Sequence, residues 1–348
     1  MDELDTLIFR TDRIGDFIIS CPFIKSYRDN FSKNPITLVS SEYNASFIDQ
    51  FEFISKTQPL KIKSRLIPKI IDLIKMIILL KKKRYKHIIV LDGKKRSFFI
   101  SFFLSGKKTV LLQSKRIKIF SKIFNYNAIT NSEVQSQAKN FSFLANVLGF
   151  TINNKNPNIY KHIKLNNKFS LKKKFLVLHI DEKWFSNLYY SDFTDINPSN
   201  VQIETFIKKI LNISNNTFNI ILTSGNKKIF DLSDHLSDFK KCDDNVFKKK
   251  INNHEVIYLH DVSFNDLANV VSNSSLVVCC EGAISHLSNN FNVPTLALYE
   301  KKKLQHTNFW TGHMKMIELY ERKKMNELLL DNNFLNVIKN SINFSQNK

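Results

Sequence analysis

Residues 264–300 decide the fold, and they read FNDLANVVSNSSLVVCCEGAISHLSNNFNVPTLALYE. Their pattern alternates a helix over 265–273, an apolar strand over 276–279, a helix over 283–290 and a strand over 295–299. Strands that alternate with helices predict parallel βαβ units. Ligands of open parallel sheets bind beyond the carboxyl ends of the strands, so the turn after the first strand, Glu281-Gly282, is a candidate site.

The same alternation extends through both halves of the chain. Further strand patterns lie at 7–10, 36–39, 87–91, 109–112, 175–179, 218–223 and 256–259, and helical patterns at 16–30, 44–51, 96–106, 198–213, 227–236 and 325–342. The stretch 151–174 is polar and rich in Asn, and we place the interdomain linker there. We predict two similar α/β domains, residues 1–160 and 161–348, with a cleft between them and the last helix packed back on the first.

The composition excludes several classes of protein. A hydrophobic share of 43% excludes a disordered chain, and seven Gly and seven Pro exclude a fibrous one. Four Cys without zinc or disulfide spacing indicate a reducing compartment. The N-terminus lacks the features of a signal peptide, and the apolar stretch 66–80 is too short to span a bilayer. We therefore expect a soluble, cytoplasmic protein.

The chain is strongly basic, with 52 Lys and Arg against 31 Asp and Glu and a net charge of +21. The segment Lys61–Lys86 holds ten Lys or Arg and one acid, Asp72, around an apolar helical pattern. A smaller cluster lies at Lys248–Lys250. Such lysines either solvate the surface or attract an anionic partner, which would be nucleic acid, a phosphorylated glycolipid or an acidic membrane leaflet.

Two turns after predicted strands are candidate anion or substrate sites. In the stretch Arg10–Asp16, Gly15 allows close backbone approach and Asp16 stands at a helix N-terminus, where its alternative role is a helix cap. After the strand 175–179, Lys183 can pair with a phosphate, and its alternative is a solvated surface lysine.

The third candidate is the turn that opens the helix 283–290. Its N–H groups can hold an anion, and Glu281 can accept hydrogen bonds from sugar hydroxyls. The alternative is a capped helix with Ser285 and His286 in its first turn. The spacing of the nine His and the acidic residues matches no metal site, so we predict none.

Three stretches resemble glycosyltransferase family 9, the heptosyltransferases of lipopolysaccharide assembly. FRTDRIGDFIISCPFIKSYRDNF resembles the family's opening strand, its R-x-D-x-I-G-D turn and the following helix. HIIVLDGKKRSFFISFFLSGKK resembles its strand that ends in Asp-Gly. Residues 264–300 are similar to its acidic turn, Ser/Met-His-Leu helix and V-P-T strand, with Glu281 where the family usually has Asp.

The resemblance implies a GT-B fold, which consists of two Rossmann-like domains with parallel sheets that face a central cleft. It implies an inverting, metal-independent glycosyltransferase (EC 2.4) that takes a sugar from a nucleotide-diphosphate sugar, ADP-heptose first, without a further cofactor. The acceptor is then an anionic glycolipid or glycan, with no nucleic acid partner. Lys61–Lys86 would dock on the inner face of the cytoplasmic membrane, and its alternative is a buried helix with a lysine-rich collar.

The resemblance also implies a role for each site residue. Asp16 is the general base that deprotonates the acceptor hydroxyl. Acceptor binding is assigned to Arg10, Arg13, Gly15, Asp92 and Arg96. Donor binding is assigned to Lys183, Glu281, Gly282, Ala283, Ser285, His286, Ser224 and Gly225.

Two other functions stay open on the sequence. A sugar-nucleotide epimerase, or a transferase for another sugar or acceptor, would use the same fold. A basic nucleic-acid-binding module would explain the charge, although the chain has no RRM, zinc-finger or OB signature and its 30 Phe are typical of core residues.

Overall fold

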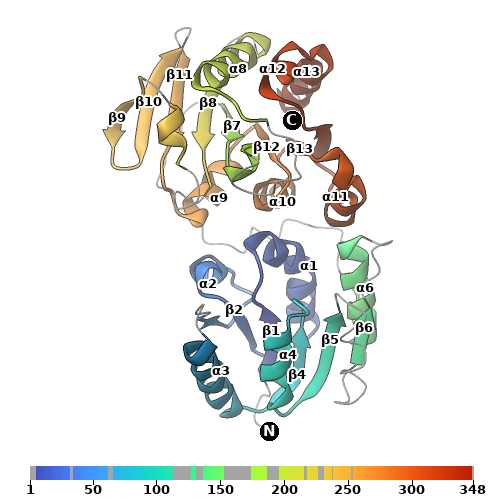
Figure 1. Ribbon diagram of the computed structural model, residues 1–348. Coiled ribbons are helices and arrows are strands. Elements are labelled where there is room, and N and C mark those ends of the chain that lie inside the picture. The colour runs from blue at the N-terminus through green and yellow to red at the C-terminus, as the bar shows by residue number, and fades with distance from the viewer. Residues whose placement is uncertain are drawn as a thin grey trace. The chain divides into compact units, whose positions relative to one another are not determined.

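The computed structural model describes residues 5–31, 34–61, 66–112, 127–130, 136–152, 174–185, 196–214, 218–225, 231–236, 238–251 and 254–346. The chain divides into two compact units, Met1–Lys164 and Leu165–Lys348. Each unit is built on one β-sheet with helices beside it (Figure 1). The predicted linker lies almost wholly outside the described residues.

The sheet of the first unit consists of six parallel strands in the order β3-β2-β1-β4-β5-β6. The strands are β1 (Asp5–Arg10), β2 (Ile36–Ser41), β3 (Lys56–Leu60), β4 (Tyr85–Val90), β5 (Lys107–Leu112) and β6 (Asn127–Thr130). The described helices are α1 (Ile14–Asn30), α2 (Glu42–Ile48), α3 (Leu66–Lys81), α4 (Lys95–Phe102) and α6 (Gln137–Val147). The strand order reverses between β1 and β4, and such a reversal opens a crevice at the carboxyl ends of the two strands.

The alternation of side chains along β1 creates two helix layers. Leu7 and Phe9 share a core cluster with residues of α3 and α4. On the opposite face, the Oγ1 atom of Thr6 lies 2.9 Å from the hydroxyl of Tyr27 in α1. The helices α1 and α6 are in contact with each other. The sheet is therefore covered by α3 and α4 on one face and by α1 and α6 on the other.

The second unit repeats this strand order and extends it. Its sheet runs β14-β13-β12-β7-β8-β11-β10-β9; the first six are parallel, and β10 and β9 form an antiparallel extension. The strands are β7 (Phe175–His179), β8 (Asn219–Thr223), β9 (Lys240–Asp243), β10 (Val246–Ile251), β11 (His254–Leu259), β12 (Leu276–Cys280), β13 (Thr295–Tyr299) and β14 (Ile317–Glu321). The order reverses between β7 and β12.

The helices of the second unit are α8 (Asn200–Ile213), α9 (Phe264–Ser272), α10 (Ala283–Asn290), α11 (Leu304–Thr311), α12 (Met325–Leu330) and α13 (Asn332–Gln346), with 3₁₀ turns η2 (Glu182–Trp184), η3 (Leu232–His235) and η4 (Lys301–Lys303). Phe334, Ile338 and Ile342 recur every four residues along α13, so they form one apolar face. This face is buried in the core of the second unit, against α8 and β13. The apolar face of α13 is thus covered within its own unit, and the packing of the last helix on the first domain stays a prediction.

The predicted elements differ in how well they match the structure. The bounds of β7, α10 and β13 are those that the sequence predicts. The helix predicted at 227–236 is wrong in its described part, since Asp231 accepts a hydrogen bond from the Ser233 amide and the chain makes only the short η3. The sequence did not predict β10, which contains the cluster Lys248–Lys250.

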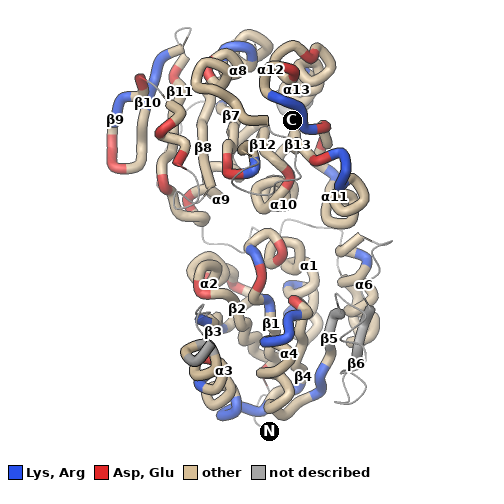
Figure 2. Tube along the Cα trace, viewed as in Figure 1, with Lys and Arg blue, Asp and Glu red and all other residues tan. Residues whose placement is uncertain are grey.

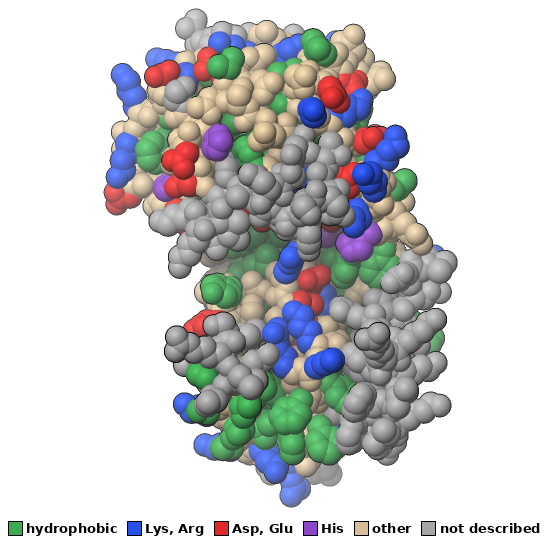
Figure 3. Space-filling model, viewed as in Figure 1, with side chains coloured by type: hydrophobic (Ala, Val, Ile, Leu, Met, Phe, Trp, Pro, Cys, Tyr) green, Lys and Arg blue, Asp and Glu red, His purple; other side chains and the backbone are tan. Residues whose placement is uncertain are grey.

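Charge and apolar side chains are unevenly spread over the surface of the first unit. Figure 2 shows Lys and Arg after the end of α3 and at the start of β5. Figure 3 shows hydrophobic side chains gathered over α3 and α4. Among the described residues, no helix has both the length and the apolar character to cross a membrane. All four cysteines are free thiols; Cys242 on β9 is exposed, and the other three are buried.

Candidate functional site

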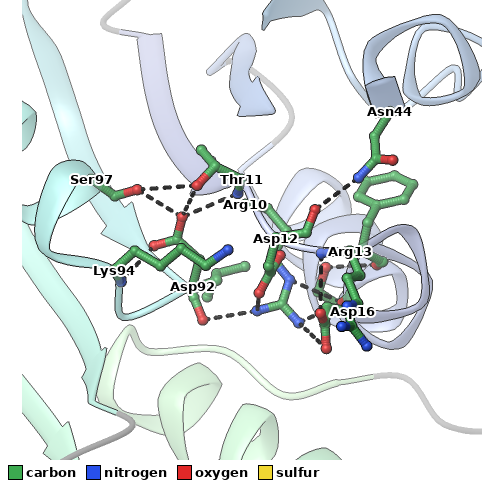
Figure 4. Close-up of polar contacts among 12 residues, drawn as sticks. Arg10, Thr11, Asp12, Arg13, Asp16, Asn44, Asp92, Lys94 and Ser97 are labelled. Atoms are coloured by element: carbon green, nitrogen blue, oxygen red, sulfur yellow. Dashed lines mark hydrogen bonds and ion pairs between the residues drawn. The ribbon is translucent and has the colours of Figure 1, made fainter. Parts of the chain in front are cut away.

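The first group of site residues lies where β1 and β4 end side by side. The turn Thr11–Arg13 follows β1 and leads into α1, and Asp92 follows β4. The Oδ2 atom of Asp92 accepts hydrogen bonds from the Thr11 hydroxyl (2.6 Å), the Thr11 amide (3.1 Å) and the Ser97 hydroxyl (2.7 Å) (Figure 4). Asp92 is fully buried, so it ties the two loops together inside the protein.

Arg10 supports the same turn from below. Its guanidinium is fully buried and donates to the backbone oxygens of Asp16 (2.9 Å) and Leu91 (2.9 Å). It also lies 3.2 Å from the Asp12 carboxylate (Figure 4). The sequence assigned Arg10 and Asp92 to acceptor binding, but the structure gives both buried contacts within the protein.

Asp16 is the third residue of α1 and is about one-fifth exposed. Its Oδ2 atom accepts a hydrogen bond from the Arg13 amide (3.2 Å), and its Oδ1 atom lies 4.0 Å from Arg10 Nη2. These contacts fix the carboxylate while part of it faces solvent. Gly15 is buried in the same helix turn, and Arg13 is exposed. Asp16 therefore serves as a helix cap and stays accessible to a ligand.

Asp12 is a carboxylate in this group that the sequence did not single out. Burial raises its pKa to about 7; Arg10 opposes this shift, and Asp16 and Asp92 add to it. Its Oδ1 atom is buried and has no hydrogen-bond partner within the described part of the chain. The motif R-x-D-x-I-G-D contains Asp12, but its burial depends on β4, which the local sequence does not reveal.

Arg96 lies on the other side of this network. Its Nη2 atom donates to the backbone oxygen and the hydroxyl of Thr11, both at 2.8 Å. Arg96 is half-buried, and it places a cation beside the turn Thr11–Arg13. Of the residues assigned to the acceptor, Arg13 and Arg96 are thus the two cations that are not fully buried.

The second group lies where β7 and β12 end side by side. The Nζ atom of Lys183, in η2, donates to the backbone oxygen of Glu281 (2.9 Å) and lies 3.8 Å from Asp181 Oδ2. A Cβ atom on Gly282 would lie 1.8 Å from this Nζ atom, so a side chain at 282 would displace the ammonium. Lys183 is about 15% exposed, which contradicts the alternative of a solvated surface lysine.

Buried groups beneath Lys183 set its environment. The amide of Lys183 donates to Asp181, which caps η2, and burial raises the pKa of Asp181 while Lys183 opposes the shift. Burial and the charge of Lys183 lower the pKa of His179 to about 3. His179 is therefore neutral at pH 7, with its Nδ1 atom 2.9 Å from the Thr223 hydroxyl.

The turn before α10 combines an internal bond with an open carboxylate. The Gly282 amide donates to Ser285 Oγ (3.1 Å), and Ser285 Oγ donates to the Gly282 oxygen (2.8 Å), so the buried Ser285 closes the turn. Ala283 is the first residue of α10. Glu281 remains about one-quarter exposed, with its Oε1 atom 3.8 Å from His286 Nε2.

His286 is buried and stacks on His313, with ring centroids 6.3 Å apart and planes 9° apart. Burial lowers the pKa of His286 well below its ordinary value, and His313 and Lys183 add to this effect. Burial also lowers the pKa of His313 to about 4. Both imidazoles are neutral at pH 7. The sequence did not find His313, because it lies in a loop outside any motif.

The loop after β8 packs against η2. A Cβ atom on Gly225 would lie 2.8 Å from the Glu182 carboxylate and 3.2 Å from Asp181 Cβ, so glycine allows this close approach. The buried Ser224 has its Oγ atom 3.3 Å from the Tyr258 hydroxyl. The residue Asn226 lies outside the described residues. Gly225 thus lies against η2, and Ser224 joins the same loop to β11.

Arg322 is a further buried cation near this group, and the sequence did not reveal it. Its Nη2 atom donates to the sulfur of Cys280 (3.4 Å) at the end of β12. Arg322 also lowers the pKa of the neighbouring Asp181. It follows β14, a strand that the sequence did not predict, so no signal placed it beside β12.

Solved structures with the same fold span nearly the whole chain. The E. coli heptosyltransferase WaaC with ADP is 16% identical, covers 98% of this chain and 100% of its own, and has a TM-score of 0.70. A family 9 glycosyl transferase from Veillonella parvula DSM 2008 is 14% identical, covers 100% and 97%, and scores 0.67. E. coli ADP-heptose lps heptosyltransferase II is 11% identical, covers 98% and 98%, and scores 0.63.

In sequence, residues 207–337 match the model of glycosyltransferase family 9 (heptosyltransferase). This match and the shared fold confirm the resemblance to glycosyltransferase family 9. The matched family consists of glycosyltransferases, which supports the predicted enzyme class, and the predicted GT-B fold of two Rossmann-like domains is confirmed. No curated protein matches the chain in sequence. The matched residues include Glu281, Gly282 and His286 of the second site.

Proposed function

We propose that this protein transfers a sugar, with inversion, from a nucleotide-diphosphate sugar to a hydroxyl of a lipopolysaccharide or other surface-glycan acceptor. The observation that carries the proposal is the position of Lys183 Nζ, 2.9 Å from the Glu281 backbone oxygen at the start of α10. An ammonium beside a helix N-terminus provides two adjacent sources of positive potential, which a diphosphate requires.

The donor that we propose first is ADP-heptose. WaaC has been solved with ADP and with ADP-2-deoxy-2-fluoro heptose, which supports this choice. The partly exposed carboxylate of Glu281 is available to donor hydroxyls and would orient the sugar. When the sugar leaves, the nucleoside diphosphate gains negative charge, and Lys183 together with the N-terminus of α10 would stabilise it.

Asp16 is the general base in this proposal. The acceptor hydroxyl gives its proton to the Asp16 carboxylate, its oxygen bonds to the anomeric carbon, and the bond from that carbon to the diphosphate oxygen breaks. A positioned base contributes about 10²–10⁴ in rate. The partial exposure of Asp16 and its bond from the Arg13 amide support this role. Arg13 and Arg96 would pair with anionic groups of the acceptor.

A panel of ADP-, GDP- and UDP-sugars tests the proposal. A ligand that binds the folded state raises the thermal midpoint by mass action. We expect the largest shift with ADP-heptose, and release of ADP once an acceptor with an inner-core sugar is added. If no nucleotide sugar shifts the midpoint at millimolar concentration, the proposed reaction is wrong. A shift with a GDP- or UDP-sugar alone would keep the transfer and change the donor.

A further inference from the structure

The helix α3 has two apolar faces. One face, with Met76 and Leu80, belongs to the core of the first unit. The other carries Ile70, Ile71, Ile74 and Ile78, whose side chains are 45–58% exposed. An amphipathic surface helix normally presents polar residues on its outer face. Packing among the described residues of the unit therefore does not explain this second apolar face.

The neighbouring helix α4 continues the same surface. Phe99, Phe102 and Phe103 are 39–47% exposed at its end, and the ring of Phe103 lies 5.1 Å from the rings of the other two. The helices α3 and α4 are in contact, and Figure 3 shows their hydrophobic side chains as one area. We define the apolar patch as Ile70, Ile71, Ile74, Ile78, Phe99, Phe102 and Phe103.

Cations lie at the end of this patch. Lys81 ends α3, Lys82, Lys83 and Arg84 follow it directly, and these four residues are exposed. Lys107 and Lys108 follow α4 at the start of β5 (Figure 2). We call these six residues the basic collar. The Lys83 ammonium pairs with Asp5, and Lys108 Nζ lies 5.8 Å from the ring centre of Phe102. The only acid within α3 is Asp72.

We propose that the apolar patch docks on an anionic lipid bilayer, with its isoleucine and phenylalanine side chains among the acyl chains and the basic collar against the phosphates. Such a combination of apolar and basic residues is typical of elements that lie in the membrane interface. Each Lys or Arg near an acidic leaflet adds to the attraction. With its 16 residues, α3 lies on the surface and does not cross it.

A second copy of the chain fits this surface less well. In a symmetric dimer the same patch meets itself, so both copies bring the basic collar to one interface. The one acid of α3 cannot pair with so many cations, and like charges repel. An anionic bilayer has the complementary sign and also accepts the apolar side chains.

The docking surface is connected to the site through α4. The Ser97 hydroxyl, in the first turn of α4, donates to Asp92 in the first site, whereas Phe102 and Phe103 end the same helix in the patch. At 1.5 Å per residue, five or six residues span about 8–9 Å. This inference rests on the proposed function in one respect: an acceptor anchored in the bilayer would then reach the turn at Asp16.

Vesicle sedimentation tests the inference with the full chain and needs no donor. The patch variant is Ile71→Ser, Ile74→Ser, Ile78→Ser, and its matched control is Val201→Ser, Leu330→Ser at exposed positions of the second unit. The collar variant is Lys81→Gln, Lys82→Gln, Arg84→Gln, which leaves the Lys83–Asp5 pair intact. Vesicles are phosphatidylcholine with and without phosphatidylglycerol, at about 0.1 and about 0.5 M salt.

We expect wild type and the control to bind the phosphatidylglycerol vesicles. The patch variant should bind them about tenfold or more weakly at both salt concentrations, because insertion of apolar side chains is not screened. The collar variant should lose binding mainly at low salt. Equal binding by wild type and the patch variant overturns the inference, as does absence of binding by wild type. A wild-type dimer that the patch variant splits, without vesicle binding, would assign the patch to self-association.

Two readouts separate this inference from the proposed function. ADP affinity and turnover on a soluble, delipidated acceptor should be the same in wild type and in the patch variant. Loss of vesicle binding with intact turnover supports docking, whereas a wild type that binds vesicles but no nucleotide sugar contradicts only the proposed reaction. The thermal midpoint of the patch variant should stay close to that of wild type, because the three isoleucines are half-exposed.

Discussion

The two sites lie at equivalent places in two sheets but have opposite arrangements of charge. In the first unit, the buried guanidinium of Arg10 lies behind the more exposed carboxylate of Asp16. In the second, the buried carboxylate of Asp181 lies behind the ammonium of Lys183. In each, an inner charge of one sign positions an outer charge of the other. The strand order thus provides the place, and the sign of the inner charge decides what the site can bind.

The two signs suit two different tasks in a sugar transfer. An outer carboxylate can accept a proton from a hydroxyl, and an outer ammonium can hold a diphosphate. Both sites contain a buried carboxyl with a raised pKa, Asp12 in the first and Asp181 in the second, but only the second also contains imidazoles with lowered pKa values, among them His313. The comparison therefore predicts opposite responses to pH as well as separate effects on turnover and binding.

The largest effect is expected from Asp16→Asn. Turnover should fall about 10²–10⁴-fold, because an amide cannot take up the proton, although its oxygen still accepts the Arg13 amide. Nucleotide affinity, measured by calorimetry, should not change. The matched control is Asp29→Asn at the end of the same helix, where the carboxylate only pairs with Lys25. Turnover near that of wild type would show that Asp16 is only a helix cap, and that the two sites do not divide the reaction in this way.

Asp12→Asn should change the pH dependence of stability. The folded pKa of Asp12 is about 7, and the unfolded value is about 4. Between these values the folded state holds a proton that the unfolded state has lost, so the free energy of unfolding falls as the pH rises. Asp12→Asn lacks this pH dependence. Its free energy of unfolding should therefore rise relative to that of wild type by about 2–4 kcal/mol from pH 4 to 7. Urea unfolding at both ends of this range measures it; parallel slopes would contradict the prediction.

Lys183→Ala should weaken the binding of a nucleoside diphosphate by about 1.5–3 kcal/mol, the usual contribution of a charged hydrogen bond. Gly282→Ala should have a similar effect, because its Cβ would displace the same ammonium. The double variant should then lose little more than either single one. Lys208→Ala, on the exposed side of α8, is the control. Unchanged ADP affinity in Lys183→Ala would show that the diphosphate is held elsewhere.

The smallest effect is expected from His313→Phe, and its sign is opposite to that of Asp12→Asn. The folded pKa of His313 is about 4 and the unfolded value is about 6.5, so acidification protonates the unfolded state first. Wild type therefore loses stability as the pH falls from 6.5 to 4. The variant should not lose this part of the free energy of unfolding, so it should be about 1–2 kcal/mol more stable relative to wild type at pH 4 than at pH 6.5. This figure is reduced for the partial exposure of the ring. His306→Phe, at an exposed position of α11, should follow wild type in the same unfolding series.

The sequence predicts the fold better than the roles of single side chains. Its apolar runs predict β7 and β13, and the turn at Gly282 predicts where α10 begins. The sequence did not reveal the antiparallel strands β9 and β10, because β9 is short and exposed throughout and three lysines interrupt the apolar residues of β10. The sequence pattern does not determine the order of strands in a sheet, so the pairing of β7 with β12 became known only from the structure.

The candidate sites show the same division. The position of Lys183 after a strand is visible in the sequence, but its contact with the turn at Glu281 spans 98 residues of chain. Arg10 and Asp92 carry charge at strand ends, which favoured a ligand role, yet both turn inward and support the loops. Whether a charged side chain points to solvent or to its own backbone depends on tertiary packing. For the same reason, the sequence did not predict that Arg322 and His313 lie at the second site.

The distribution of the four thiols allows the second unit to be labelled chemically at a single position. Cys242 is exposed on β9, while Cys21, Cys279 and Cys280 are buried, and burial raises the pKa values of these three well above that of an ordinary thiol. A maleimide dye reacts with the accessible thiolate, so it should attach at one position without any prior removal of cysteines. A fluorophore or spin label on β9 would then report from one known place on the second unit.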